Sequence, residues 1–99
     1  MVVGLSDFLA FAKTLNGETL FTRERRKPFT VSVIGNALRY TPHSTMKPRS
    51  DSVQAIEKVL ERFAQGKSLK PGDYQDLTMN ASYLLAILTR YLAEKGGRS

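Results

Sequence analysis

The chain has 99 residues, enough for one domain with a modest core and too few for two. It contains no cysteine and one histidine, which excludes disulfide scaffolds, thiolate zinc sites and cysteine nucleophiles. The formal net charge is +6. All of this excess lies in residues 22–49, which hold seven of the 15 Lys and Arg residues and one of the nine acidic residues, leaving eight of each sign elsewhere. So uneven a distribution predicts an anionic partner.

The N-terminal residues predict a helix, with Ser6 as its N-cap and Asn16-Gly17 as its C-terminal stop. Apolar residues from Leu5 to Leu15 fall at helical spacing. The sequence has neither a basic leader nor a run of about 20 apolar residues, so we expect no signal peptide, no membrane partner and a cytoplasmic protein.

A β-hairpin is the strongest local pattern in the chain. Two apolar-polar alternating runs flank Gly35-Asn36, and glycine in the first turn position favours a type II′ turn. A two-residue loop pairs Ile34 with Ala37 at the turn and Phe29 with Pro42 at the far end. One face of the hairpin is then apolar and comprises Phe29, Val31, Val33, Leu38 and Tyr40. The other face comprises Thr30, Ser32, Ile34, Ala37, Arg39 and Thr41.

A short run around Phe21 predicts one more strand, so we expect a three-stranded antiparallel meander packed on helices. Residues 43–50 lack any period and contain a proline, which predicts a loop. The second helix is expected to begin near Asp51 or Ser52, where Asp51 and Gln54 resemble a capping box.

A third helix is predicted from Asp73 to about Glu94, and its broad apolar surface suggests a central position. The resulting order is α-β-β-β-α-α. We therefore predict a two-layer α+β fold, with a single domain over residues 1–95 and a flexible tail over residues 96–99.

The sequence offers no convincing catalytic constellation. His43 and Ser44 are neighbours in the predicted loop, and adjacent residues on an extended chain point apart, so they do not predict a nucleophile–base pair. Helix capping and a solvated helix face account for most acidic residues, and the basic segment contains only Glu24. We expect no metal, no cofactor and no enzymatic activity. A small ribonuclease-type toxin that uses His43 is the third alternative.

Antiparallel pairing is expected to bring most of the basic residues to one end of the sheet, because the connector before Phe29 and the loop after Pro42 leave from that end. Short hydroxyl side chains beside them suit contacts to phosphates. The predicted nucleic-acid-binding residues are Arg23, Arg25, Arg26, Lys27, Arg39, Lys47 and Arg49, together with Thr30, Ser32 and Thr41.

Duplex DNA is favoured over single strands, because the polar face of the hairpin carries no aromatic side chain on which bases could stack. Phe21 is the one exception, since its register is not fixed. The alternative function is an adaptor that docks an acidic protein through the same cations, and a solvated flexible loop is the simplest interpretation of the charge run. A homodimer seam formed by Tyr83 and Ile87 competes with their use in the core.

Overall fold

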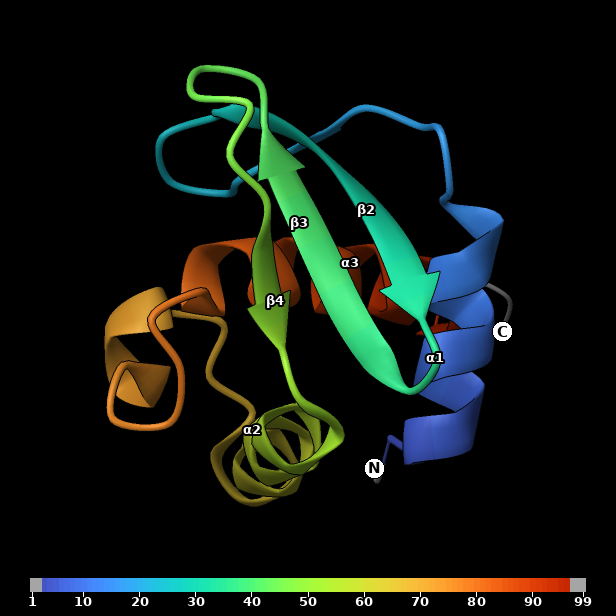
Figure 1. The fold of residues 1–99 in the computed structure, drawn as a ribbon. Coiled ribbons are helices and arrows are strands. Elements are labelled where there is room, and N and C mark those ends of the chain that lie inside the picture. Colours follow the sequence, from blue (N-terminus) through green and yellow to red (C-terminus); the bar gives the residue numbers. More distant parts are fainter. Residues whose placement is uncertain (1–2, 97–99) are drawn as a thin grey trace.

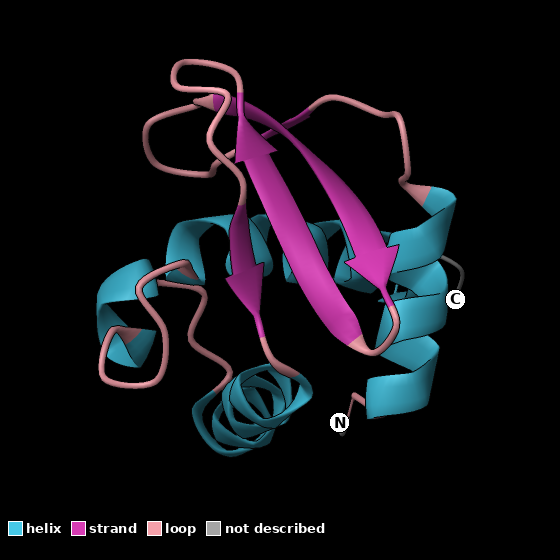
Figure 2. Ribbon diagram, viewed as in Figure 1, coloured by secondary structure: helices cyan, strands magenta, loops and turns pink. Residues whose placement is uncertain are grey.

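The computed structural model describes residues 3–96 as an antiparallel sheet and a set of helices (Figures 1 and 2). The elements in chain order are α1 (Leu5–Thr14), β1 (Leu20–Phe21), β2 (Pro28–Ile34), β3 (Ala37–Pro42), β4 (Arg49–Asp51), α2 (Val53–Gly66), the 3₁₀ helix η1 (Pro71–Tyr74) and α3 (Ala81–Gly96). The strands lie in the order β1-β2-β3-β4. In Figure 1 the sheet lies in front of α3, with α1 beside it and α2 below. The predicted α+β fold is confirmed.

The hairpin has the predicted register. Ile34 pairs with Ala37, Val31 with Tyr40 and Phe29 with Pro42. Gly35 has a φ of 63°, and Asn36 is not among the residues with positive φ, as a type II′ turn requires. Local alternation and turn chemistry therefore specify this part of the fold.

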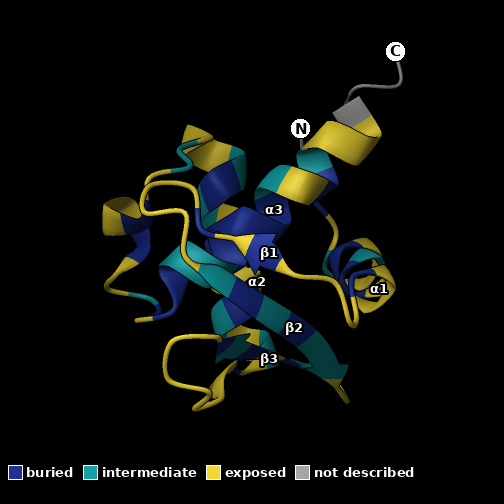
Figure 3. Cartoon of the chain, turned by 90° about the horizontal axis from the view of Figure 1, so that it is seen from above, coloured by how far each residue is buried: buried dark blue, intermediate teal, exposed yellow. Residues whose placement is uncertain are grey.

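The core lies between the sheet and the helices, as Figure 3 shows by colouring the buried residues dark blue. Phe29 and Tyr40 of the apolar hairpin face are fully buried. Tyr83 of α3 packs on both of them, with ring centroids 5.0 Å from Phe29 and 5.5 Å from Tyr40. Edge-to-face and stacked aromatic pairs of this kind join the hairpin to α3.

The sheet has four strands, so the predicted three-stranded meander is wrong in this respect. The end of the predicted loop forms β4, which pairs with β3 through Tyr40 opposite Arg49 and Leu38 opposite Asp51. Asp51 is buried rather than placed as a helix cap, and Ser52 caps α2 by accepting a hydrogen bond from the amide of Ala55 (3.3 Å). The capping box of Asp51 and Gln54 is therefore wrong. The short β4 has no apolar alternation by which the sequence could reveal it.

The second helix begins where predicted, with Ser52 as its N-cap, whereas the first residues of α1 and α3 differ from the prediction. Gly4, not Ser6, precedes α1, and no side chain caps this helix. The third helix does not begin at Asp73, because η1 is followed by an irregular segment and α3 starts at Ala81. The predicted tail lies outside the described residues, apart from Gly96 at the end of α3. Among residues 3–96, no helix is long and apolar enough to cross a membrane.

Candidate nucleic-acid interface

Two basic connections lie at the same end of the sheet, at the top of Figure 1. The first connection, residues 22–27 between β1 and β2, carries four of the seven basic residues of the segment. The second connection, residues 43–48 between β3 and β4, starts beside β2, because the amide of His43 donates a hydrogen bond to the carbonyl of Pro28 (3.1 Å). The Gly35-Asn36 turn lies at the other end of the strands.

Hydrogen bonds close the first connection. The amide of Thr22 donates to the carbonyl of Lys27, and the amide of Lys27 donates to Oγ1 of Thr22, both over 3.0 Å. Arg26 has a φ of 54° and donates its amide to the carbonyl of Thr22. Thr22 itself is buried. These bonds argue against an unstructured loop as the explanation of the charge run.

The second connection is also closed by its own hydrogen bonds. The amide of Met46 donates to the carbonyl of Pro42 (2.8 Å), and the amide of Lys47 donates to Oγ1 of Thr45 (3.2 Å). Lys47 is exposed in this turn. Both basic connections are therefore tight turns held to the sheet.

The polar face of the sheet points away from the helices, and no helix crosses in front of it in Figure 1. Thr30, Ser32 and Thr41 are half-buried on this face, and Arg39 is exposed. Arg39 pairs with Ser50 of β4, which is also exposed. We call this surface the open face.

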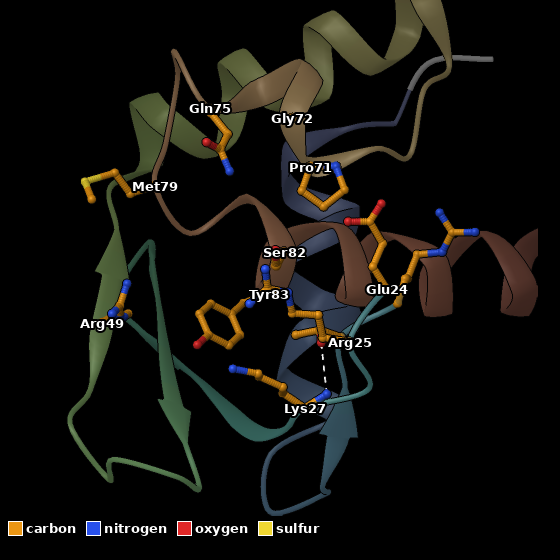
Figure 4. A pocket seen from close by; sticks show the side chains of 12 residues that line it. Glu24, Arg25, Lys27, Arg49, Pro71, Gly72, Gln75, Met79, Ser82 and Tyr83 are labelled. Carbon is orange, nitrogen blue, oxygen red and sulfur yellow. Dashed lines mark hydrogen bonds between the residues drawn. The ribbon is translucent and has the colours of Figure 1, made fainter.

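The opposite side of the sheet holds a hollow of about 510 Å³. It lies between the first connection, the start of β4 and the segment from η1 to the first turn of α3. The charged residues that line it are Arg23, Glu24, Arg25, Lys27 and Arg49. In Figure 4, Tyr83 points into the space between Arg49 on one side and Lys27 and Arg25 on the other. We call this site the cationic hollow.

The predicted site residues therefore divide between two sides of the sheet. Arg49 lies opposite Tyr40, and directly opposed residues project from the same face, so Arg49 faces the helix side. Arg39, one residue before Tyr40, faces the open side. Among the seven predicted cations, only Arg39 projects from a strand of the open face.

The cations of the hollow have few partners of their own. Among the described residues, the two ion pairs are Arg62 with Asp76 (2.6 Å) and Arg90 with Glu18 (2.8 Å), and all four residues lie outside the basic segment. Arg23 donates a hydrogen bond to the carbonyl of Leu69 (3.1 Å), which ties the first connection to the segment before η1. Arg23 therefore has a structural use that the sequence did not suggest.

Phe21 is the aromatic residue whose placement the sequence left open. It is 48% exposed, and the guanidinium of Arg26 lies 5.7 Å from the centre of its ring. This cation–π contact places Arg26 over Phe21 at the edge strand β1.

Tyr83 is the member of the site that the sequence pattern missed. Its helical spacing suggested the core or a dimer seam, whereas the structure leaves Tyr83 partly exposed in the hollow that Arg49 of β4 also lines. Ile87 is fully buried and is unavailable for the predicted seam with Tyr83. His43 is exposed in the second connection. Within residues 3–96, no group of three or more His, Cys, Asp or Glu side chains could hold a metal ion.

Comparison with protein-family models, with curated proteins and with solved structures finds no match for this chain.

Proposed function

We propose that the protein is a non-enzymatic nucleic-acid-binding module and that duplex DNA is its ligand. One observation carries the proposal: two ordered basic connections adjoin a polar sheet face that no helix covers. A concentration of cations without acidic partners attracts polyanions over several ångströms and contacts their phosphates.

The open face has a size that suits the major groove. Adjacent strands lie about 4.8 Å apart, so β2 and β4 are separated by about 10 Å, and the groove is about 12 Å wide. Arg39 lies on β3, the middle strand of these three, where its guanidinium can donate two hydrogen bonds to guanine. The hydroxyls of Thr30, Ser32 and Thr41 are suited to phosphate oxygens or to base edges.

The basic connections supply the contacts to the backbone. Arg26 and Lys47 are exposed, one in each connection, at the same end of the sheet. With the open face in the major groove, both side chains would lie near the phosphates that flank the groove. Contacts of this kind position the protein and carry little sequence information, whereas Arg39 would carry most of the discrimination between bases.

Titration of a labelled DNA duplex, followed by fluorescence anisotropy at several salt concentrations, tests the proposal. If Arg26 and Lys47 each neutralise one phosphate, the logarithm of affinity should fall against the logarithm of salt with a slope of roughly −2. Replacing Arg26 or Lys47 by Ala should reduce this slope by about 1 each. Arg39→Ala should weaken binding to a preferred duplex about tenfold, because a bidentate contact to guanine is lost.

Lys58→Ala is the control, because Lys58 is exposed on α2, away from both connections, and its loss should leave affinity unchanged. Undetectable binding to duplex DNA at low salt would contradict the proposal. If the protein binds RNA or an acidic protein but not duplex DNA, the same basic residues form the binding site for that other partner. RNA that stays intact with wild type and with His43→Ala agrees with a non-enzymatic module, whereas cleavage that requires His43 would favour the toxin.

A further inference from the structure

We infer that the cationic hollow is a second binding site, for the phosphate monoester at the end of a nucleic-acid strand. The source of the phosphate rests on the proposed function. The chemistry of the hollow stands independently of it, because the hollow lies on the side of the sheet that faces away from the open face.

Four cations and the carboxylate of Glu24 line this site. Arg23 already donates to a backbone carbonyl, so three cations from two parts of the chain remain for a ligand. Arg25 and Lys27 come from the first connection and Arg49 from the first residue of β4. Among the described residues, none of the three forms an ion pair. Like charges that share a recess repel one another, and an anion bound between them removes that repulsion. Arginine forks and a lysine point charge together suit the oxygens of a phosphate.

Tyr83 adds a neutral donor between these cations. Its ring is held from behind by the core, through Tyr40 at 5.5 Å and Phe29 at 5.0 Å. Among the described residues its hydroxyl has no hydrogen-bond partner, and Figure 4 shows the side chain pointing into the hollow. The hydroxyl is therefore fixed in position and available to a ligand.

The hollow favours a terminal phosphate over an internal one. A phosphate monoester carries a charge of about −1.5 to −2 at pH 7 and three free oxygens, whereas a diester carries one charge and continues into a sugar on both sides. A recess with cations on opposite walls can enclose a phosphate at the end of a strand. A phosphate diester would need room for a sugar on each side, and the recess would have to exclude one of them.

The size of the hollow leaves room for the nucleoside that bears the phosphate. Its volume of about 510 Å³ lies in the range of small-molecule sites, roughly 300 to 1,000 Å³. Met79 lines the hollow and is 84% exposed, so it offers an apolar surface next to the cations. A strand terminus and a free 5′-mononucleotide share this chemistry, and the experiment separates them.

The test compares a duplex that has a short single-stranded 5′ overhang with the same duplex carrying a 5′-phosphate, by anisotropy with the label on the far end. We expect the phosphorylated form to bind about tenfold more tightly, as charge-assisted contacts in a recess imply. Lys27→Ala and Arg49→Ala should each reduce this advantage to about twofold or less. Equal affinity of wild type for the two forms would overturn the inference.

Three variants keep the result interpretable. Arg25→Ala removes a cation from an exposed turn and should lower the advantage of the phosphate without unfolding the chain, which a thermal melt verifies. Arg39→Ala should weaken binding of both forms by the same factor, because Arg39 lies on the other side of the sheet. Lys58→Ala should change neither affinity.

Competition with a free 5′-mononucleotide identifies the source of the phosphate. If the mononucleotide fails to displace the overhang at millimolar concentration, the strand terminus is the ligand. If it displaces the overhang and also binds alone, with dependence on Lys27 and Arg49, the site is for free nucleotides, which supports the monoester chemistry and overturns the strand-end assignment. Binding of the unphosphorylated duplex without any gain from the phosphate overturns this inference and leaves the proposed function intact.

Discussion

The carboxylate of Asp51 joins β4 to two other parts of the chain. Oδ2 accepts a hydrogen bond from the hydroxyl of Tyr40 (2.8 Å), and Oδ1 accepts one from Oγ1 of Thr78 (2.6 Å) and one from the side-chain amide of Asn80 (3.3 Å). All of these residues are buried. A buried carboxylate stabilises the folded state when each buried donor around it has an oxygen to bond, and a donor left without an acceptor destabilises that state. Asp51 therefore fixes the strand that carries Arg49.

Asp51→Asn should lower the free energy of unfolding by about 2 kcal/mol, because an amide group would face a buried donor and leave it without an acceptor. Urea denaturation followed by circular dichroism measures the change. Glu57→Gln, an equivalent substitution on the exposed face of α2, should stay within about 0.5 kcal/mol of wild type. Equal stability of the two variants would show that the network around Asp51 contributes little.

At the level of elements, the hairpin of β2 and β3 supports the whole open face. Its register decides that Arg39 faces outward while Tyr40 faces the core. A shift of one residue would exchange these faces and bury the guanidinium. The turn at Gly35, with its φ of 63°, holds the register because an L-residue with a side chain rarely adopts that conformation.

Gly35→Ala should destabilise the protein by about 1–2 kcal/mol. A Cβ at this position has no atom within 4 Å, so the cost arises from the backbone conformation and not from a clash. Thermal denaturation measures the effect. Gly72→Ala is the matched control, since its Cβ also has open space and its φ is not positive, and it should be neutral or slightly stabilising. A neutral Gly35→Ala would contradict the importance of the turn.

At the level of the whole molecule, the shifted pKa values of two tyrosines and one aspartate contribute to the pH dependence of the free energy of unfolding. Burial, together with the neighbouring charge of Asp51, raises the pKa of Tyr40 well above 10.0, and burial and Asp73 raise the pKa of Tyr74. The hydrogen bond from Arg62 lowers the pKa of Asp76 below 3.8. The raised pKa values of the two tyrosines contribute to the free energy of unfolding below pH 10, and this contribution is lost as the pH rises above 10. The lowered value of Asp76 adds stability that is present above pH 3.8 and is lost in more acidic solution.

We therefore expect a nearly constant free energy of unfolding between about pH 5 and pH 9. Above pH 10 it should fall, by up to about 1.4 kcal/mol per pH unit for Tyr40, because the unfolded chain ionises this phenol before the folded chain does. The acidic decrease from Asp76 should be small, since that pair is exposed. Urea titrations across this range measure the profile. If Tyr40→Phe falls as steeply as wild type above pH 10, Tyr40 is not the cause.

The sequence by itself determined the features that depend on neighbours along the chain. Alternating residues and a glycine-first turn defined the register from Phe29 to Pro42, and the same register brought the ends of two basic stretches to one end of the sheet. Helical spacing located the three helices and the start of α2, whereas α1 and α3 begin at other residues than the sequence predicted.

Only the tertiary structure decided the features that join distant segments. The strand at residues 49–51 has no alternation of apolar and polar residues. It is held in place by pairing with β3 and by the hydrogen bonds that Thr78 and Asn80 donate to Asp51. That pairing turns Arg49 toward the helices and away from Arg39. Adjacent positions on a strand project to opposite faces, so the face on which a basic side chain lies depends on how its strand pairs with a distant strand. The order of charges along the chain does not specify that pairing.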